Sequence, residues 1–223
     1  MSKYRNVKIK GNGNRVGDTT TVTNNYYNQP NRGSDGNEII GIGLGLVVLL
    51  AAVVWFFFNH IDQVYFYLRV GAVTSPILAI LAIVIFWKSG YLEEIDLIGT
   101  TSSIAMCAVL VLLSEMTRQN ISDEIIQLAL RTDVLSFWDR LSDYGKKNVA
   151  AHFLSAILLT FAIFVTHLFS LRQLSESAGN PDGLGFWYGL YEGLSFFRMR
   201  NTYISFFILA ILIFVAAYWN KIF

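Results

Sequence analysis

The sequence predicts an all-α integral membrane protein: a five-helix transmembrane bundle with an amphipathic helical loop and a short β-prone N-terminal tail. Two observations carry this prediction. Five long apolar runs follow one another along the 223-residue chain, and hydrophobic residues make up 54% of it. Charged residues make up only 15%, whereas a typical soluble domain has about 25%. The chain therefore has too few charges to cover a water-facing surface.

The five runs are long enough, or nearly so, to cross a hydrocarbon core about 30 Å thick. Because every backbone polar group in hydrocarbon must pair internally, each run should be a helix. The third and fifth runs lie near the lower length limit of about 17 residues. We predict spans at residues 39–58, 70–87, 97–113, 149–171 and 204–219, within a transmembrane domain of residues 38–223.

Two connections between the spans are long. Residues 117–147 carry apolar side chains at helical spacing, with Ser122 as a candidate N-cap, and predict one or two amphipathic helices. Residues 172–202 begin polar and end in a stretch rich in Gly, Trp, Tyr and Phe. That composition favours an interfacial or re-entrant segment.

Basic residues give the expected orientation. With the N-terminus inside, the cytoplasmic segments hold ten of the 17 Lys and Arg residues and the opposite side holds seven. Positive charge favours the cytoplasmic side. The first apolar run starts far behind the basic N-terminal residues, so we expect an anchor there, not a cleaved signal peptide. We predict a multi-pass protein of the bacterial inner (plasma) membrane with a cytoplasmic N-terminus.

The tail, residues 1–37, is rich in Gly, Asn and Thr and has the features of a stacking element. Its apolar residues alternate with lysines, the period of a strand. A Gly/Asn run then predicts a turn, because both residues accept positive φ. A disordered polar leader is the alternative. The residues expected to mediate assembly are Val7, Ile9, Gly11, Asn12, Gly13, Asn14, Val16 and Gly17.

The motif G-N-G-N-x-V-G-D, which begins at Gly11, resembles bacterial amyloid-signalling motifs and related β-stacking tails of membrane effectors in bacterial immunity. The resemblance covers residues 6–28 and does not extend to the membrane part. It implies that the tail mediates assembly or recruits a partner by strand stacking.

Small and polar residues mark surfaces on the first and third spans. Gly41 and Gly45 form a G-x-x-x-G seam, which permits close helix approach, although membrane helices also tolerate glycine without such a contact. The third span opens with four small hydroxyl residues, which we expect to pack between helices or to line a wet path. These four residues are Thr100, Thr101, Ser102 and Ser103.

The fourth span is the main candidate site. At about 100° per residue its polar side chains fall on one side of the helix, and Leu154, Leu158, Phe161 and Phe164 on the other. Polar groups within a span seldom face lipid. They point to a helix interface or to a conducting, water-lined face. The candidate residues are His152, Ser155, Thr160, Thr166, His167 and Ser170.

Catalytic signatures are missing from the sequence. Glu93, Glu94 and Asp96 form an acidic cluster that we interpret as a charged turn, and the single cysteine, Cys107, has no metal-ligand spacing around it. No nucleophile motif, phosphate-binding loop or zinc motif occurs. We therefore predict no enzyme activity, no cofactor and no metal. A net charge of +1 also predicts no nucleic-acid partner.

Together these features favour an oligomeric bacterial inner-membrane effector or sensor that alters membrane permeability or ion flux, with anti-phage defence as one setting. Its expected partners are the lipid bilayer, further copies of the chain, and a cytoplasmic protein bound through the tail. The alternative is a non-conducting accessory or immunity-type membrane protein that binds a partner protein.

Overall fold

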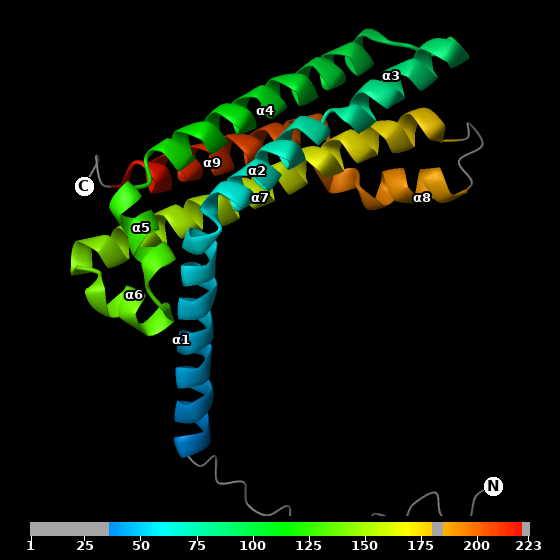
Figure 1. The fold of residues 1–223 in the computed structure, drawn as a ribbon. Helices are drawn as coiled ribbons and strands as arrows, with labels where there is room; N and C mark the ends of the chain where they lie inside the picture. The colour runs from blue at the N-terminus through cyan, green and yellow to red at the C-terminus, as the bar shows by residue number, and fades with distance from the viewer. Residues whose placement is uncertain (1–35, 180–184, 220–223) are drawn as a thin grey trace, which may run out of the picture. The chain divides into compact units, whose positions relative to one another are not determined.

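The computed structural model describes residues 36–179 and 185–219, and for residues 36–41 it describes the backbone alone (Figure 1). Within the described ranges 89% of the residues are helical and none lies in a β-strand, so the all-α prediction is confirmed for this part of the chain. The predicted tail strands and turn, from Val7 to Gly17, lie outside the described residues.

Nine α-helices and one 3-10 helix form the described part of the chain. They are α1 (Gly36–Asn59), α2 (Ile61–Thr74), α3 (Ile77–Ser89), α4 (Glu94–Gln119), α5 (Asp123–Arg131), α6 (Val134–Arg140), α7 (Asp143–Ala178), α8 (Phe186–Gly193), η1 (Ser195–Phe197) and α9 (Met199–Ala217). The chain divides into two units, Met1–Val47 and Val48–Phe223. Everything below on packing concerns the second unit.

Within the described residues, five segments are long and apolar enough to cross a membrane, the same number as the predicted apolar runs. They are Ile42–Asn59, Ile61–Ser89, Glu94–Gln119, Asp143–Ala178 and Met199–Ala217. The helices are longer than most of the predicted runs. The third and fifth, predicted near the lower length limit, have 26 and 19 residues. Polar and charged residues extend the helices beyond the apolar windows on which the prediction was based.

The second segment shows the largest difference, because its helix begins at Ile61 where the prediction began at residue 70. Charged residues in this early part hid the helix from an apolar-run criterion. Each has a partner on α4: Arg69 Nη1 lies 3.0 Å from Glu115 Oε2, and Arg118 Nη2 lies 2.8 Å from Asp62 Oδ1. Paired charges are cheaper to hold in a helix bundle than isolated ones.

Pro76 separates α2 from α3 within this second segment. Proline has no backbone N–H to continue the helical ladder. The chain tightens ahead of it, with the Ser75 N–H donating to the Ala72 carbonyl at 3.2 Å and the Ser75 hydroxyl to the same oxygen at 2.8 Å. The α2 and α3 helices therefore have slightly different directions against α7.

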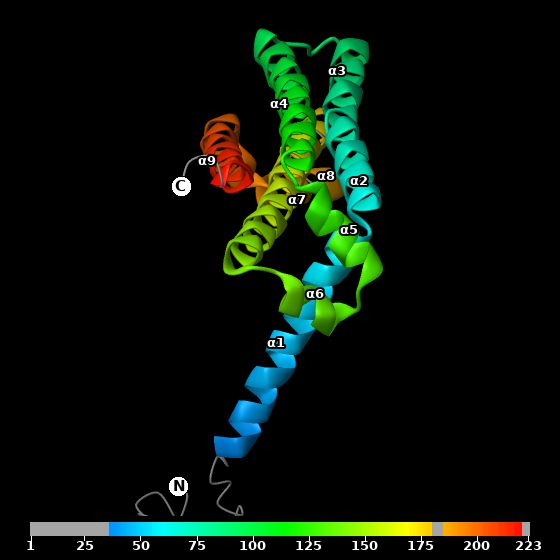
Figure 2. The ribbon, with the colours of Figure 1, turned by 60° about the vertical axis from the view of Figure 1, so that its left-hand side comes forward.

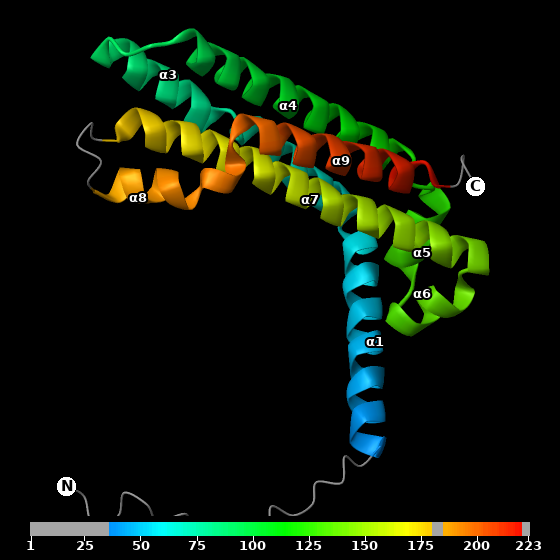
Figure 3. The ribbon, with the colours of Figure 1, turned by 180° about the vertical axis from the view of Figure 1, so that it is seen from behind.

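Helix α7 is the centre of the second unit. It contacts α3, α4, α8 and α9, and Figures 1 and 3 show α4 and α9 running beside it. At 1.5 Å per residue its 36 residues make a rod of about 54 Å, longer than a hydrocarbon core of about 30 Å. It starts earlier than predicted because the Ser142 hydroxyl caps it, accepting the Gly145 N–H at 3.1 Å.

The predicted amphipathic connection forms two short helices, α5 and α6, at the N-terminal end of α7 (Figure 2). Ser122 is the N-cap residue of α5 but makes no side-chain cap bond. Asp133 caps α6 by accepting the Ser136 N–H at 2.8 Å. The bonds from Ser136 hold the pKa of the Asp133 carboxyl below its ordinary value.

The indole N–H groups of two tryptophans hold α5 and α6 against the last turns of α1. The Trp55 indole N–H lies 3.2 Å from the Ala129 carbonyl and 3.0 Å from that of Thr132. In the opposite direction, the Trp138 indole donates to the Ala51 carbonyl at 3.1 Å. Aromatic rings fill the space between these bonds, so the amphipathic helices pack on the protein here.

The polar connection after the fourth span also contains helices. Helix α7 runs on to Ala178, and the described part of the following stretch forms α8 and η1 before α9 begins. Figure 3 shows α8 lying beside the C-terminal end of α7. The interfacial or re-entrant placement stays a prediction.

Candidate functional site

The buried stripe of α7 carries polar side chains along much of its length. We call six of them the α7 seam: Asn148, His152, Ser155, Thr166, His167 and Ser170. All are buried except His167, which is half-buried. Their spacing of three and four residues places them on one face, as the helical projection predicts. On the other side Leu154, Phe161 and Phe164 are exposed, as predicted, and Leu158 is half-buried.

The C-terminal half of the α7 seam is hydrogen-bonded to two neighbouring helices. The hydroxyls of Ser170 and Ser103 lie 2.7 Å apart, joining α7 to α4. Thr74 Oγ1 on α2 lies 3.3 Å from His167 Nε2. These contacts close this half of the seam against α4 and α2.

Both ring nitrogens of His167 have a partner. Its Nδ1 lies 2.9 Å from the Ile163 carbonyl, which can only accept, so Nδ1 carries a proton. Its Nε2 lies 3.3 Å from the Thr74 hydroxyl, which donates to the Gly71 carbonyl at 3.0 Å.

The hydroxyl residues that open the third span face three different helices. Thr100 donates to the Ala79 carbonyl of α3 at 3.2 Å. Ser103 meets α7, and Ser102 accepts a hydrogen bond from the Tyr203 hydroxyl of α9. Thr101 is exposed. Three of the four residues therefore join α4 to its neighbours.

The N-terminal half of the seam holds two buried polar atoms, Asn148 Oδ1 and His152 Nδ1, that have no hydrogen-bond partner within the described chain, and Ser114 Oγ on α4 has none either. Such atoms also occur just beyond the C-terminal half of the seam, at Arg172 Nε and Gln173 Oε1. Each costs about 1–3 kcal/mol if it stays dry. The Tyr65 hydroxyl lies beside Ser155, whose own hydroxyl donates to the His152 carbonyl at 2.7 Å.

An apolar layer separates the two polar halves. On α7 it consists of Leu159, Ala162 and Ile163, and on the buried stripe of α4 it consists of Met106 and Leu110. We call these five residues the apolar constriction. The α4 stripe repeats the pattern, because hydroxyl residues flank its apolar members on both sides.

The constriction is tightly closed on the α2 side. A Cβ added at Gly71 would lie 3.3 Å from Ile163 Cγ2, a tight contact that would require the Ile163 side chain to shift by a few tenths of an ångström. Along α7 the stretch from Ser155 to Thr166 spans about 16 Å at 1.5 Å per residue. Buried apolar side chains thus separate the polar residues at the two ends of this stretch.

Other predicted residues lie away from this site. Thr160 is exposed, and its hydroxyl bonds only to the Ala156 carbonyl of its own helix, at 2.9 Å. A Cβ at Gly45 would meet nothing within 4 Å, and the surroundings of Gly41 lie outside the described residues. Cys107 is a free, half-buried thiol.

The acidic cluster begins α4. The Glu93 N–H donates to Asp96 Oδ2 at 3.0 Å, a helix-capping contact that agrees with a charged turn. Among the described residues no group of three or more His, Cys, Asp or Glu is arranged to hold a metal ion.

Sequence reasoning missed Tyr65, Asn148 and the constriction. Tyr65 follows charged and polar residues and reads as an interfacial aromatic, yet it is fully buried. Asn148 lies one residue outside the apolar window, and only continuing the three-and-four spacing back from His152 would have found it. The constriction could not be recognised from the sequence of one helix, because it combines residues of α7 with residues of α4.

The fold and this site define a class: the described part of the chain is largely helical and has five helices long and apolar enough to cross a membrane, which is compatible with a multi-pass membrane protein. Comparison with protein-family models, with curated proteins and with solved structures finds no match.

Proposed function

We propose that this protein is an oligomeric effector or sensor of the bacterial inner membrane that alters membrane permeability, with anti-phage defence as one setting. The chain crosses the bilayer five times, with its N-terminus in the cytoplasm and its C-terminus outside. The α7 seam is the route by which water and ions cross. The apolar constriction holds that route shut until a signal moves α7 against α2 and α4.

The observation that carries this proposal is the pair of unpartnered buried atoms in the N-terminal half of the seam. Asn148 Oδ1 and His152 Nδ1 have no hydrogen-bond partner in the described chain, whereas a helix interface built only for packing would pair or replace them. Buried polar groups without protein partners are ordinarily satisfied by water. A hydrated vestibule next to a dry constriction is the arrangement of a pore gated by dewetting.

The contacts around the constriction support movement of α7 against its neighbours. The Ser103–Ser170 and Thr74–His167 contacts are single hydrogen bonds between side chains. Such bonds within membranes contribute about 0.6 kcal/mol on average. A modest signal is therefore enough to exchange them for bonds to water.

Ala162→Ser tests the constriction. It adds one hydroxyl in the middle of the dry layer with little change of volume, and eases wetting there. Basal ion flux through the full chain in liposomes is expected to rise by about tenfold, the effect of roughly 1.4 kcal/mol on the barrier. The matched control is Ala150→Ser, the same change at an exposed position of α7.

Flux that stays at the level of protein-free liposomes in both variants and in the unmodified chain would refute the permeability proposal. It would favour the alternative, a non-conducting membrane protein that binds a partner. The hydrogen-bonded C-terminal half of the seam is the feature that favours this alternative, since it agrees with simple helix packing.

The tail is proposed to assemble several chains by strand stacking, which brings their membrane parts together. Ile9→Asn in the full chain removes an apolar residue from one face of the predicted strand and is expected to lower the crosslinked oligomer fraction in membranes severalfold. Lys8→Asn changes the opposite face and is expected to leave it intact. Equal oligomer fractions in both variants would remove the basis for stacking.

A further inference from the structure

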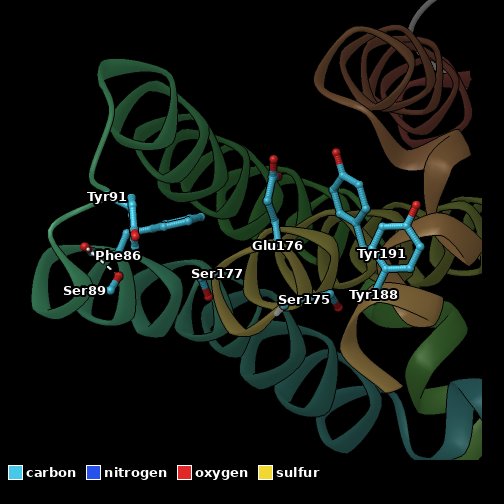
Figure 4. Close-up of a pocket in the computed structure, with 9 residues that line it drawn as sticks. Phe86, Ser89, Tyr91, Ser175, Glu176, Ser177, Tyr188 and Tyr191 are labelled. Atoms are coloured by element: carbon cyan, nitrogen blue, oxygen red, sulfur yellow. Dashed lines mark hydrogen bonds between the residues drawn. The ribbon is translucent and has the colours of Figure 1, made fainter. Parts of the chain in front are cut away.

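A cavity of about 560 Å³ lies between the end of α3, the C-terminal end of α7 and helix α8, away from the α7 seam. Aromatic side chains from two sides form its walls: Phe86 and Tyr91 from the α3 end, Tyr188 and Tyr191 from α8. Figure 4 shows Glu176 of α7 between these two groups. The cavity thus combines aromatic faces with one carboxylate.

Local backbone geometry places the aromatic walls. Gly90 ends α3 with φ of +76°, a left-handed conformation that favours glycine, and the Tyr91 N–H turns back to the Phe86 carbonyl at 3.0 Å. On the other side, Arg172 stacks its guanidinium 4.4 Å from the centre of the Tyr191 ring. That contact holds the ring in place and already shows a cation against a wall residue.

The serines of the cavity present acceptors and not donors. Ser89 donates its hydroxyl proton to its own helix, at 2.9 Å from the Ile85 carbonyl. In the same way Ser175 donates to Leu171 and Ser177 to Leu174, both at 2.8 Å. Ser175 is fully buried, so the oxygen lone pairs accessible to a ligand are those of Ser89 and Ser177. A ligand that matches this set must supply N–H or O–H donors.

The charge around the cavity is negative. Glu93 and Asp96, at the start of α4, lie close enough to act electrostatically on Glu176. Arg172 Nη1 is 3.9 Å from Glu176 Oε2, too far for a hydrogen bond, so it compensates that carboxylate only in part. Residues 86–96 and 172–177 together carry four acidic and two basic side chains. This field attracts cations.

We propose that this cavity binds an organic ammonium group. Glu176 supplies the counter-charge, the serine oxygens accept its N–H bonds, and the tyrosine rings cover its faces. The same chemistry occurs in the amine headgroup of a lipid such as phosphatidylethanolamine and in a small soluble amine. The site is independent of whether the α7 seam conducts.

The test uses the full chain in nanodiscs of phosphatidylglycerol, which has no amine. Ethanolamine is titrated by calorimetry, and tetramethylammonium, which has no N–H, serves as the comparison. In a second arm, native mass spectrometry measures retention of phosphatidylethanolamine relative to phosphatidylglycerol. Glu176→Gln is expected to weaken binding at least about tenfold. Glu192→Gln, the same change at an exposed α8 residue outside the cavity, is expected to leave it unchanged.

Tyr188→Leu, which removes one aromatic wall while leaving Arg172 and Tyr191 intact, provides a second variant and should also weaken binding. Selective retention of the lipid assigns the headgroup as the source, and a response to ethanolamine assigns the soluble amine. Either result supports the proposal. It is overturned if neither probe binds, if tetramethylammonium binds as tightly as ethanolamine, or if Glu192→Gln loses as much affinity as Glu176→Gln.

Discussion

Phe137→Ala is expected to lower the free energy of unfolding by about 3–5 kcal/mol, the range for truncating a buried phenylalanine. Phe137 is fully buried on α6, with its ring centroid 6.3 Å from that of Phe58 at the end of α1. Rigid neighbours on both sides limit collapse into the space left behind. The loss should release α6 and α5 together, because the two indole hydrogen bonds depend on the same packing.

Leu135→Ala on the same helix is the matched control. Leu135 is 75% exposed, so its truncation is expected to change stability by less than about 0.5 kcal/mol. Equilibrium unfolding in mixed detergent micelles, followed by the fluorescence of Trp55 and Trp138, measures both. If Phe137→Ala lowered the stability as little as Leu135→Ala does, Phe137 would not be part of the packed core, and this would contradict the structure.

Much of the helical architecture was predictable because apolar runs of membrane-spanning length allow few other folds. The residues at which the helices begin and end were not predictable. Ile61–Val70 is helical through pairing of Arg69 and Asp62 with residues of α4 that follow more than forty positions later. Such long-range pairs leave no local signal. Pro76, by contrast, is visible in the sequence. It lies near the start of the predicted span, but in the structure it divides α2 from α3, in the middle of a segment that starts at Ile61.

The candidate site divides in the same way. The one-sided polar pattern of the fourth span could be read from a helical projection, and the structure places its residues on a buried stripe. Thr160 shows the limit of that projection: it lies at the edge of the polar arc, and tertiary packing leaves it exposed. The apolar constriction and the aromatic cavity combine residues from several helices. A single-helix pattern has no way to predict them.

The two seam histidines are expected to respond to the same substitution with opposite signs. His152 is 1% exposed and its Nδ1 has no partner in the described chain. His152→Leu removes that group and is expected to raise the free energy of unfolding, by about 1–3 kcal/mol if the site is dry and by less if water occupies it. His167→Leu breaks contacts to Ile163 and Thr74 and is expected to lower it by about 0.5–1.5 kcal/mol.

The same His152→Leu substitution is expected to lower ion flux while it raises stability. If the N-terminal half of the seam holds water, the variant dries it, and ion flux in the Ala162→Ser background should fall by about tenfold or more. Stability measured by unfolding and flux measured in liposomes therefore separate two uses of one residue. A gain in stability with unchanged flux would assign His152 to packing alone. A loss of stability would show that the ring is well satisfied, by water or by the chain, in a way that leucine does not replace.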